Sequence, residues 1–194
     1  MIEKTRCDWC LSSENMMQYH DTFWGTPLHD DQELYAKLVL DLNQAGLSWN
    51  TILNKTENFY AAFDNFNIEK VAKYDDTDRE RLIQNEGIIR NKLKVNAAIV
   101  NAQKVLAIQK EFGSFDAYLW GFVNRKVVEN HLSDEASRPA STELSDRISK
   151  DMKKRGFKFT GTTVIYAYLQ AVGIVNDHLT SCFRYQELTS QNKS

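Results

Sequence analysis

The sequence contains little proline or glycine. Only two prolines and eight glycines occur among 194 residues, which disfavours a turn-rich β fold. Leu, Ala, Lys, Glu and Gln instead fill long periodic stretches, and these residues favour helices. The expected fold class is all-α. A chain of this length can bury the core of one domain, or of two small lobes that share a cleft.

Long apolar runs are absent as well, and cysteine is scarce. The N-terminal sequence MIEKTRCDWC lacks the apolar core of a signal peptide, and no run of about 18 apolar residues predicts a membrane span. Three cysteines do not make a secreted disulfide framework, and in a reducing compartment they favour a metal site or inert burial. We therefore expect a cytoplasmic protein with no membrane partner.

Excess positive charge is missing too. The formal net charge is −2 and the pI is near 6.1, which argues against a surface coated with cations for nucleic acid. Basic residues still gather in two stretches: Arg90, Lys92, Lys94, Lys104 and Lys110, and then Arg147, Lys150, Lys153, Lys154, Arg155 and Lys158. Each stretch can meet phosphate, or can form the solvated outer face of a helix.

Hydrophobic periodicity predicts the main helices. Leucines every four residues over 31–43 mark an apolar helical face, and Asp41 lies at its edge, where it should be partly desolvated. Ser48 can cap a second, aromatic-rich helix after a corner at Gly46. A long helix is expected from Asn91 to Gly113. The least periodic stretch, 124–141, is expected to be an exposed connection.

Two cysteines and two histidines form the first group of candidate functional residues. Cys7 and His20 lie near the start of the chain, and His178 and Cys182 lie four residues apart in HLTSC. Two thiolates and two imidazoles fill a tetrahedral zinc shell with no open position, so such a site would be structural. Buried thiols with hydrogen-bonded imidazoles are the alternative. Cys10 can also pair with Cys7, either as a metal ligand or as a redox partner.

Residues 82–99, LIQNEGIIRNKLKVNAAI, form the second group. The stretch predicts a helix, a tight glycine turn and another helix. Such a turn exposes backbone N–H groups at a helix start, where hydrogen bonds and the helix dipole hold a phosphate. Arg90 and Lys92 would flank the anion. A plain helical corner explains the same pattern equally well.

Aromatic residues near one carboxylate form the third group. They are Trp9, Tyr19, Phe23, Trp24 and Trp49, with Asp41 close by in the sequence pattern. Aromatic walls stack on nucleobases and attract cationic ones, and a carboxylate adds charge complementarity. Such residues also commonly form a hydrophobic core.

Taken together, these motifs resemble one family over residues 5–183. The strings RCDWC, YHDTFWGTPLHDDQELYAKL, QAGLSW, GIIRNKLKVNAAI and KKRGFKFTGTTVIYAYLQAVGIVNDH, with the terminal His-x3-Cys, are similar to DNA-3-methyladenine glycosylase I. The resemblance implies a helix-hairpin-helix DNA glycosylase fold with the hairpin at about 82–99. It implies one helical domain over 1–185, with two lobes around a cleft, followed by a polar tail over 186–194.

The same resemblance implies the site residues and their partners. Structural Zn²⁺ would join the N- and C-terminal segments. Double-stranded DNA with alkylated bases would be the substrate of a monomer, and free 3-methyladenine the product. The implied residues are the metal ligands Cys7, His20, His178 and Cys182, the catalytic residues Asp41 and Tyr19, the substrate-binding residues Trp9, Trp24, Trp49 and Leu47, and the DNA-binding residues Gly87, Ile88, Arg90 and Lys92.

Two positions depart from the family pattern. Asp41 stands where the family has a glutamate, which retracts the carboxylate by about 1.5 Å, one carbon–carbon bond. Met16 stands where some members carry a tyrosine. A non-catalytic protein that binds alkylated DNA is therefore an alternative, since the shortened acid could have cost the activity. A zinc hydrolase is a second alternative, but it needs an open coordination position.

Overall fold

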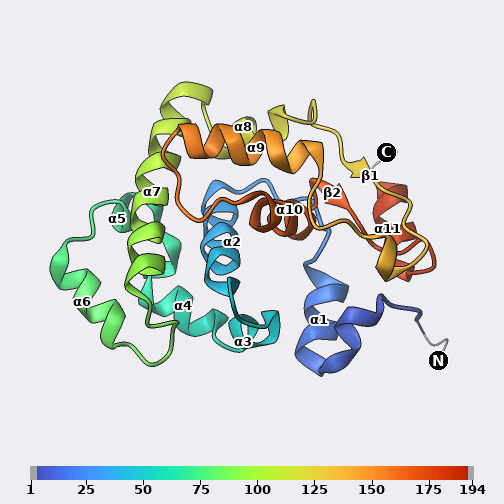
Figure 1. Cartoon of the computed structure of the whole chain (residues 1–194), viewed down its shortest axis with the longest axis horizontal. Coiled ribbons are helices and arrows are strands. Elements are labelled where there is room, and N and C mark those ends of the chain that lie inside the picture. Colours follow the sequence, from blue (N-terminus) through green and yellow to red (C-terminus); the bar gives the residue numbers. More distant parts are fainter. Residues whose placement is uncertain (1–3, 192–194) are drawn as a thin grey trace.

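Helices make up most of the structure, a computed structural model that describes residues 4–191 (Figure 1). This confirms the all-α expectation. The elements in chain order are η1 (Asp8–Ser12), α1 (Glu14–Thr22), α2 (Asp31–Gln44), α3 (Trp49–Leu53), α4 (Thr56–Ala62), η2 (Asp64–Phe66), α5 (Ile68–Val71), α6 (Asp76–Gln84), α7 (Lys92–Phe112), α8 (Phe115–Gly121), β1 (Val128–Glu129), η3 (Glu135–Ser137), α9 (Glu143–Lys154), α10 (Thr162–Ala171), β2 (Val175–Asn176) and α11 (Phe183–Gln191).

Side-chain caps set several of these boundaries. The Ser48 hydroxyl accepts a hydrogen bond from the Thr51 N–H and starts α3, as predicted. Asn91 caps α7, and Gly113 ends it with a positive φ of 89°. The aromatic helix expected after Ser48 is interrupted, however. Lys55 leaves helical geometry between α3 and α4 and donates to the Glu86 carbonyl oxygen at 2.9 Å, so the chain bends there.

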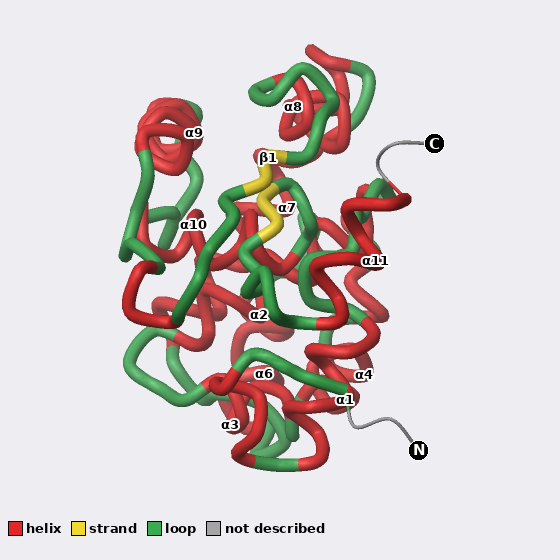
Figure 2. The backbone as a smooth tube through the Cα atoms, turned by 90° about the vertical axis from the view of Figure 1, so that its right-hand side faces the viewer, coloured by secondary structure: helices red, strands yellow, loops and turns green. Residues whose placement is uncertain are grey.

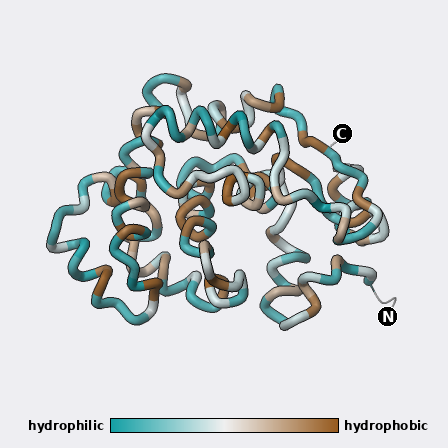
Figure 3. The backbone as a smooth tube through the Cα atoms, viewed as in Figure 1, coloured by the Kyte–Doolittle hydropathy of each residue, from teal (hydrophilic) through white to brown (hydrophobic). Residues whose placement is uncertain are grey.

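Helix α2 forms the centre of the core. All residues of α2 from Leu34 to Asn43 are buried, and Figure 3 shows hydrophobic turns concentrated along this helix, whereas α9 at the periphery is largely hydrophilic. Both flanking helices are bonded to it by buried tyrosines. The Tyr35 hydroxyl donates to the Ala98 carbonyl of α7 at 2.9 Å, and the Tyr168 hydroxyl of α10 donates to the Leu34 carbonyl at 3.0 Å. Packing against α7 and α10 thus fixes the direction of α2 side chains.

The connection over 124–141 is more ordered than its sequence suggests. Strand β1 pairs in parallel with β2, and Figure 2 shows these two short strands side by side among the helices. The Leu132 carbonyl accepts from the Thr180 N–H at 2.8 Å, and Leu132 is buried. Two-residue strands are too short to show hydrophobic alternation, which explains why the sequence pattern indicated only an exposed connection.

The C-terminal end also differs from expectation. Residues 186–191 continue α11 rather than forming a tail, because Leu188 is buried and packs close to Gly25. Residues 192–194 lie outside the described residues. The Phe183 N–H donates to the Thr5 carbonyl at 3.0 Å, so segments from both chain ends lie side by side (Figure 1). Over the described range, every helix is too short or too polar to cross a membrane.

Candidate functional site

A cavity of about 170 Å³ opens between α1, α2, α3 and α10. The structure brings together here the predicted carboxylate and four of the five predicted aromatic residues; the fifth, Phe23, stacks on Tyr19 with ring centroids 5.6 Å apart but does not line the space. The lining residues are Trp9, Tyr19, Trp24, Lys37, Asp41, Gln44, Trp49, Arg138, Ala167, Gln170 and Ala171.

The aromatic rings pack in two pairs around this cavity. Trp9 and Trp24 meet edge to face, with centroids 5.1 Å apart and planes at 69°. Tyr19 and Trp49 are also 5.1 Å apart, with planes at 47°. Burial raises the pKa of Tyr19 well above its usual value, so its hydroxyl stays protonated. The walls are therefore flat, apolar surfaces of the kind on which a nucleobase stacks.

Lys37 is a cavity residue that sequence patterns did not single out. It lies one helical turn before Asp41 on α2, and the two side chains form a salt bridge with 4% of each residue exposed. The Lys37 ammonium also lies 4.2 Å from the ring centroid of Trp49. The available sequence signal was a Lys and an Asp four positions apart in the otherwise apolar stretch 34–42.

The ion pair leaves one oxygen of Asp41 without a partner. Asp41 Oδ1 accepts from Lys37, whereas the buried Oδ2 has no hydrogen-bond partner among the described residues. Burial raises the pKa of Asp41 and lowers the pKa of Lys37, and the attraction between the two opposes both shifts. A buried acceptor without a donor is costly, which marks Oδ2 as a contact point for a ligand.

Arg138 is a second charged lining residue that the sequence analysis missed. It reaches the cavity from the 124–141 connection, and its guanidinium lies 5.6 Å from the ring centroid of Trp24. A salt bridge to Glu135 and a hydrogen bond of 3.0 Å to the Asp177 carbonyl hold it in place. No residue in an aperiodic segment carries a positional signal, so this placement depends on the tertiary fold.

The corner between α2 and α3 borders the cavity. Gly46 has a φ of 79°, a conformation that glycine adopts readily. Leu47 is 40% exposed and is not among the residues that line the cavity, which leaves it free to project outward. The buried Lys94 ammonium of α7 donates to the Asn43 and Ala45 carbonyls at 2.7 and 2.8 Å. Lys94 thus couples the corner to the start of α7.

The predicted hairpin consists of α6, a turn over 85–91 and α7. In this turn the Gly87 N–H donates to Asn85 Oδ1 at 2.8 Å, and the Ile88 N–H donates to the Asn85 carbonyl at 3.4 Å. Both groups were expected to face phosphate, and both are engaged within the protein. Among the described residues, no acceptor is found for the N–H groups of Ile89 and Arg90. The free donors therefore lie further along the turn than expected.

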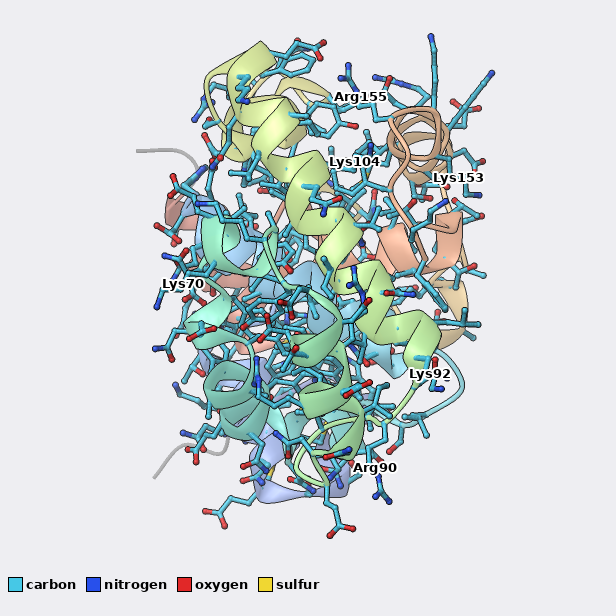
Figure 4. All side chains as sticks on the ribbon, turned by 90° about the vertical axis from the view of Figure 1, so that its left-hand side faces the viewer. Lys70, Arg90, Lys92, Lys104, Lys153 and Arg155 are labelled. Carbon is cyan, nitrogen blue, oxygen red and sulfur yellow. The ribbon has the colours of Figure 1, made fainter. Side chains whose placement is uncertain are left out.

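Charged side chains surround the hairpin unevenly. Figure 4 shows Arg90 and Lys92 near the start of α7, with Lys104, Lys153 and Arg155 towards its other end. Arg90 pairs with Glu86 at 3.3 Å, while Lys92 is exposed. Arg155 is engaged by Glu111 and Asp151. The basic stretches are thus partly neutralised, and the hairpin end retains an exposed cation.

The predicted metal ligands form one buried cluster. Their donor atoms all lie within 4.8 Å of one another, and all four residues, Cys7, His20, His178 and Cys182, are fully buried. Cys182 Sγ is 3.5 Å from His20 Nε2 and 3.6 Å from His178 Nδ1, and Cys7 Sγ is 3.8 Å from the same Nδ1. Sulfur and nitrogen ligands of a tetrahedral zinc ion would be about 3.6 Å apart. The cluster therefore fits the ion.

Outer contacts orient both imidazoles. His20 Nδ1 is 2.8 Å from Asp21 Oδ1, and His178 Nε2 is 3.0 Å from the Trp24 carbonyl. These contacts leave one ring nitrogen of each histidine directed at the cluster. Cys10 is separate, because its thiol donates to the Cys7 carbonyl at 3.1 Å. Trp24 lines the cavity as well, so the cluster anchors one wall of the pocket.

Comparison with known proteins identifies the family of this chain. A family model described as methyladenine glycosylase matches residues 9–185. The chain belongs to the methyladenine glycosylase family. It is 43% identical over 178 residues to the DNA-3-methyladenine glycosylase of Haemophilus influenzae, covering 92% of this chain and 96% of the relative. It is 42% identical to DNA-3-methyladenine glycosylase 1 of Escherichia coli K12, covering 93% and 96%.

Solved structures agree with this membership in the methyladenine glycosylase family. A crystal structure of 3-methyladenine DNA glycosylase I superposes with a TM-score of 0.89 at 43% identity, covering 92% of this chain and 98% of that one. The enzyme from Staphylococcus aureus, described as showing the structural basis of 3-methyladenine recognition, gives 0.89 at 35% identity, covering 92% and 95%. The resemblance seen in the sequence motifs is thereby confirmed.

Proposed function

We propose that this chain is a monofunctional base-excision repair glycosylase that flips 3-methyladenine out of alkylated DNA and hydrolyses its glycosidic bond. Its family and the names of its relatives support this activity. The observation that carries the proposal for this chain is the aromatic cavity with the unpartnered Asp41 Oδ2. Its volume of about 170 Å³ is below the roughly 300–1,000 Å³ typical of sites for drug-sized ligands, which suits a single base.

Cleavage of this glycosidic bond requires little acid catalysis by the protein. A 3-methyladenine base is cationic while attached to deoxyribose, so the bond from N9 to the sugar is already weakened. The bonding electron pair moves to N9, the base leaves neutral, and water adds to the sugar carbon with loss of a proton. The protein must therefore extrude the nucleotide, at a cost of a few kcal/mol, and hold the base in place.

Asp41 and the aromatic rings would hold the flipped base. Asp41 Oδ2 is an acceptor for the exocyclic amine, and the shorter side chain relative to the family glutamate is fixed by Lys37 rather than left mobile. Trp9, Tyr19 and Trp49 supply the stacking walls. Trp24 closes the side of the pocket nearest the metal cluster.

DNA engagement would use the hairpin and the corner together. The N–H groups of Ile89 and Arg90, which have no acceptor in the described part of the chain, can bind a phosphate, and the exposed Lys92 adds a positive charge. Leu47 would occupy the gap left by the flipped nucleotide, because it is an exposed apolar residue on the turn between α2 and α3. Lys94 bonds the corner to the helix that follows the hairpin, so both contacts keep a fixed separation.

Replacing Lys92 by alanine tests the hairpin. We expect weaker binding to every duplex, alkylated or not. The slope of log K against log salt concentration should become shallower by about one, which corresponds to the loss of one phosphate contact. Binding would be measured by fluorescence anisotropy over a series of salt concentrations. Lys110→Ala, on the same helix near its other end, is the matched control and should keep the parental slope. An unchanged slope for Lys92→Ala would show that Lys92 does not contact the DNA phosphates.

The activity itself is tested by measuring free 3-methyladenine released from methylated duplex DNA by the purified protein. We expect catalytic release by the parent. Binding of the alkylated duplex without release would instead favour the non-catalytic alternative, in which Asp41 cannot replace the family glutamate. In that case Asp41→Glu should restore release.

We also propose that Cys7, His20, His178 and Cys182 hold a structural zinc ion. The fully buried cluster has the donor set and the spacing of a tetrahedral site, and four protein ligands leave no position for a reacting water. This argues against the zinc-hydrolase alternative. Zinc would join segments 171 positions apart at Cys7 and His178, and closing so long a loop restricts the unfolded chain.

A further inference from the structure

Another cavity, of about 350 Å³, lies between α8 and α9 and is called the α8–α9 groove below. Figure 1 shows α8 and α9 along the upper edge of the molecule, whereas α3 lies at the lower edge. Phe112, the last residue of α7, lines the groove, and Lys92, beside the hairpin, begins the same helix. The helical rise separates these two positions by roughly 30 Å. An occupant of the groove would therefore leave the hairpin free.

Three aromatic residues form the walls of the α8–α9 groove. Phe112 is 41% exposed and meets Tyr118 with ring centroids 5.2 Å apart, and Tyr118 meets Phe122 at 5.3 Å. Single exposed apolar residues are ordinary, but rings in mutual contact around one cavity form a continuous apolar surface. Gly121 also lines the groove, and a Cβ at this glycine would face open space. The groove therefore has room for an apolar side chain beside Gly121.

Arg155 holds these rings in position. Its guanidinium lies 4.9 Å from the ring centroid of Phe112 and 5.3 Å from that of Tyr118. Glu111 and Asp151 bind Arg155 at 2.7 and 2.6 Å, and the Tyr118 hydroxyl donates to Asp151 at 2.8 Å. The walls are thus fixed before any occupant binds, which lowers the entropic cost of binding. Because Arg155 engages both carboxylates, they offer little attraction to a basic partner.

Cations without a counter-charge border the groove on α9. Arg147 lines it, with its guanidinium 6.0 Å from the ring centroid of Phe122, and donates to the Phe122 carbonyl at 3.4 Å. Lys150 and Lys154 follow three and seven positions later, so they lie on the same side of the helix. All three cations are exposed, and none makes a salt bridge within residues 4–191. One acid, Glu143, lies a turn before them, so the balance is positive.

We propose that the α8–α9 groove is a protein-docking surface that binds an acidic segment of a partner protein, with one aromatic side chain of that segment beside Gly121. Aromatic residues and arginine are enriched at the centres of protein interfaces. Arg147, Lys150 and Lys154 would pair with carboxylates on either side of the aromatic side chain. Duplex phosphates would also satisfy these cations, but they would leave the apolar rings uncovered, which favours the peptide.

The test titrates short peptides into the isotope-labelled full chain and follows its amide signals by NMR. The probe is acetylated and amidated Asp-Glu-Trp-Glu-Asp. Two matched peptides replace the tryptophan by alanine or the four acids by lysines. At concentrations up to about 1 mM, the probe should shift the signals of Phe112, Gly121 and Phe122. The alanine peptide should bind about tenfold more weakly or worse, since it lacks the aromatic side chain, and the lysine peptide should leave these signals unchanged.

Two variants separate the shape of the groove from its charge. Gly121→Met fills the open space and should weaken binding of the probe by about tenfold or more, and Gly121→Gln replaces it if it does not fold. Gly161→Met is the matched control, because a Cβ there also faces open space, outside the groove. Arg147→Ser should weaken probe binding and leave the affinity for duplex DNA at the parental value. Circular dichroism and thermal unfolding would check that each variant is folded.

Four results would overturn the proposal. The first is an absence of shifts around the groove at about 1 mM probe, or equal binding of the lysine peptide. The second is an affinity of folded Gly121→Met within about twofold of the parent. A shallower salt slope for DNA binding by Arg147→Ser would assign the cations to DNA instead. A concentration-dependent dimer of the parent in sedimentation, lost in Gly121→Met, would assign the groove to a second copy of the chain.

Discussion

Replacing Asp41 by asparagine is expected to lower kcat/KM for the release of 3-methyladenine by about a hundredfold. Asp41 has two acceptor oxygens: Oδ1 binds Lys37, and Oδ2 has no partner within residues 4–191. Asparagine has one acceptor oxygen, so either Lys37 or the amine of the base loses its partner. An unsatisfied buried donor costs about 1–3 kcal/mol, and each 1.4 kcal/mol is a factor of ten.

The same substitution should destabilise the fold, because it leaves the Lys37 ammonium buried without a counter-charge. Removing one partner of a buried ion pair typically costs about 3–5 kcal/mol, whereas replacing both partners by apolar residues is often neutral. Lys37→Met/Asp41→Leu should therefore recover the stability of the parent in urea unfolding, but should not recover base release. Parental base release by the double variant would show that the Asp41 carboxylate is not needed.

Replacing Cys182 by serine is expected to remove the metal and to lower the free energy of unfolding by about 4 kcal/mol or more. Metal binding to a folded cluster contributes directly to folding, and here it would join both ends of the chain. For a domain of this size, the loss corresponds to a decrease in Tm of roughly 10 °C or more. Zinc content by mass spectrometry and thermal unfolding measure the two effects.

Cys10→Ser is the matched control for the zinc site. Cys10 is as buried as the four cluster residues, but its thiol bonds the Cys7 carbonyl and lies outside the cluster. It should retain one zinc ion per chain, with a small decrease in Tm. A parent protein that contains no zinc, or a Cys182→Ser variant with parental Tm, would contradict the metal assignment.

The parts of the site that the sequence predicted are those with a local signal. The leucine period of α2, the serine cap of α3 and the glycine corner between them placed Asp41 beside Trp49. Lys37 escaped notice because a lysine in a helix is usually solvated, and only the arrangement of α1, α3 and α10 around the cavity shows that its ammonium is enclosed.

Other differences come from contacts between distant segments. Arg138 is held at the cavity by Glu135 and by the Asp177 carbonyl, 39 positions away, and a contact between such distant segments has no periodic signal. The sequence located the hairpin turn correctly. The Asn85 side chain accepts a hydrogen bond from the Gly87 N–H, however, and only the geometry of the turn reveals this contact. The end of the chain was expected to be a polar tail, and the burial of a single leucine, Leu188, extends α11 to Gln191.

The most direct measurement is a crystal structure of this protein with 3-methyladenine bound. The base should lie among Trp9, Tyr19 and Trp49, with its exocyclic amine donating to Asp41 Oδ2 while Lys37 remains paired with Oδ1. A base bound outside this cavity, or bound inside it without a hydrogen bond to Asp41, would contradict the role assigned to the carboxylate.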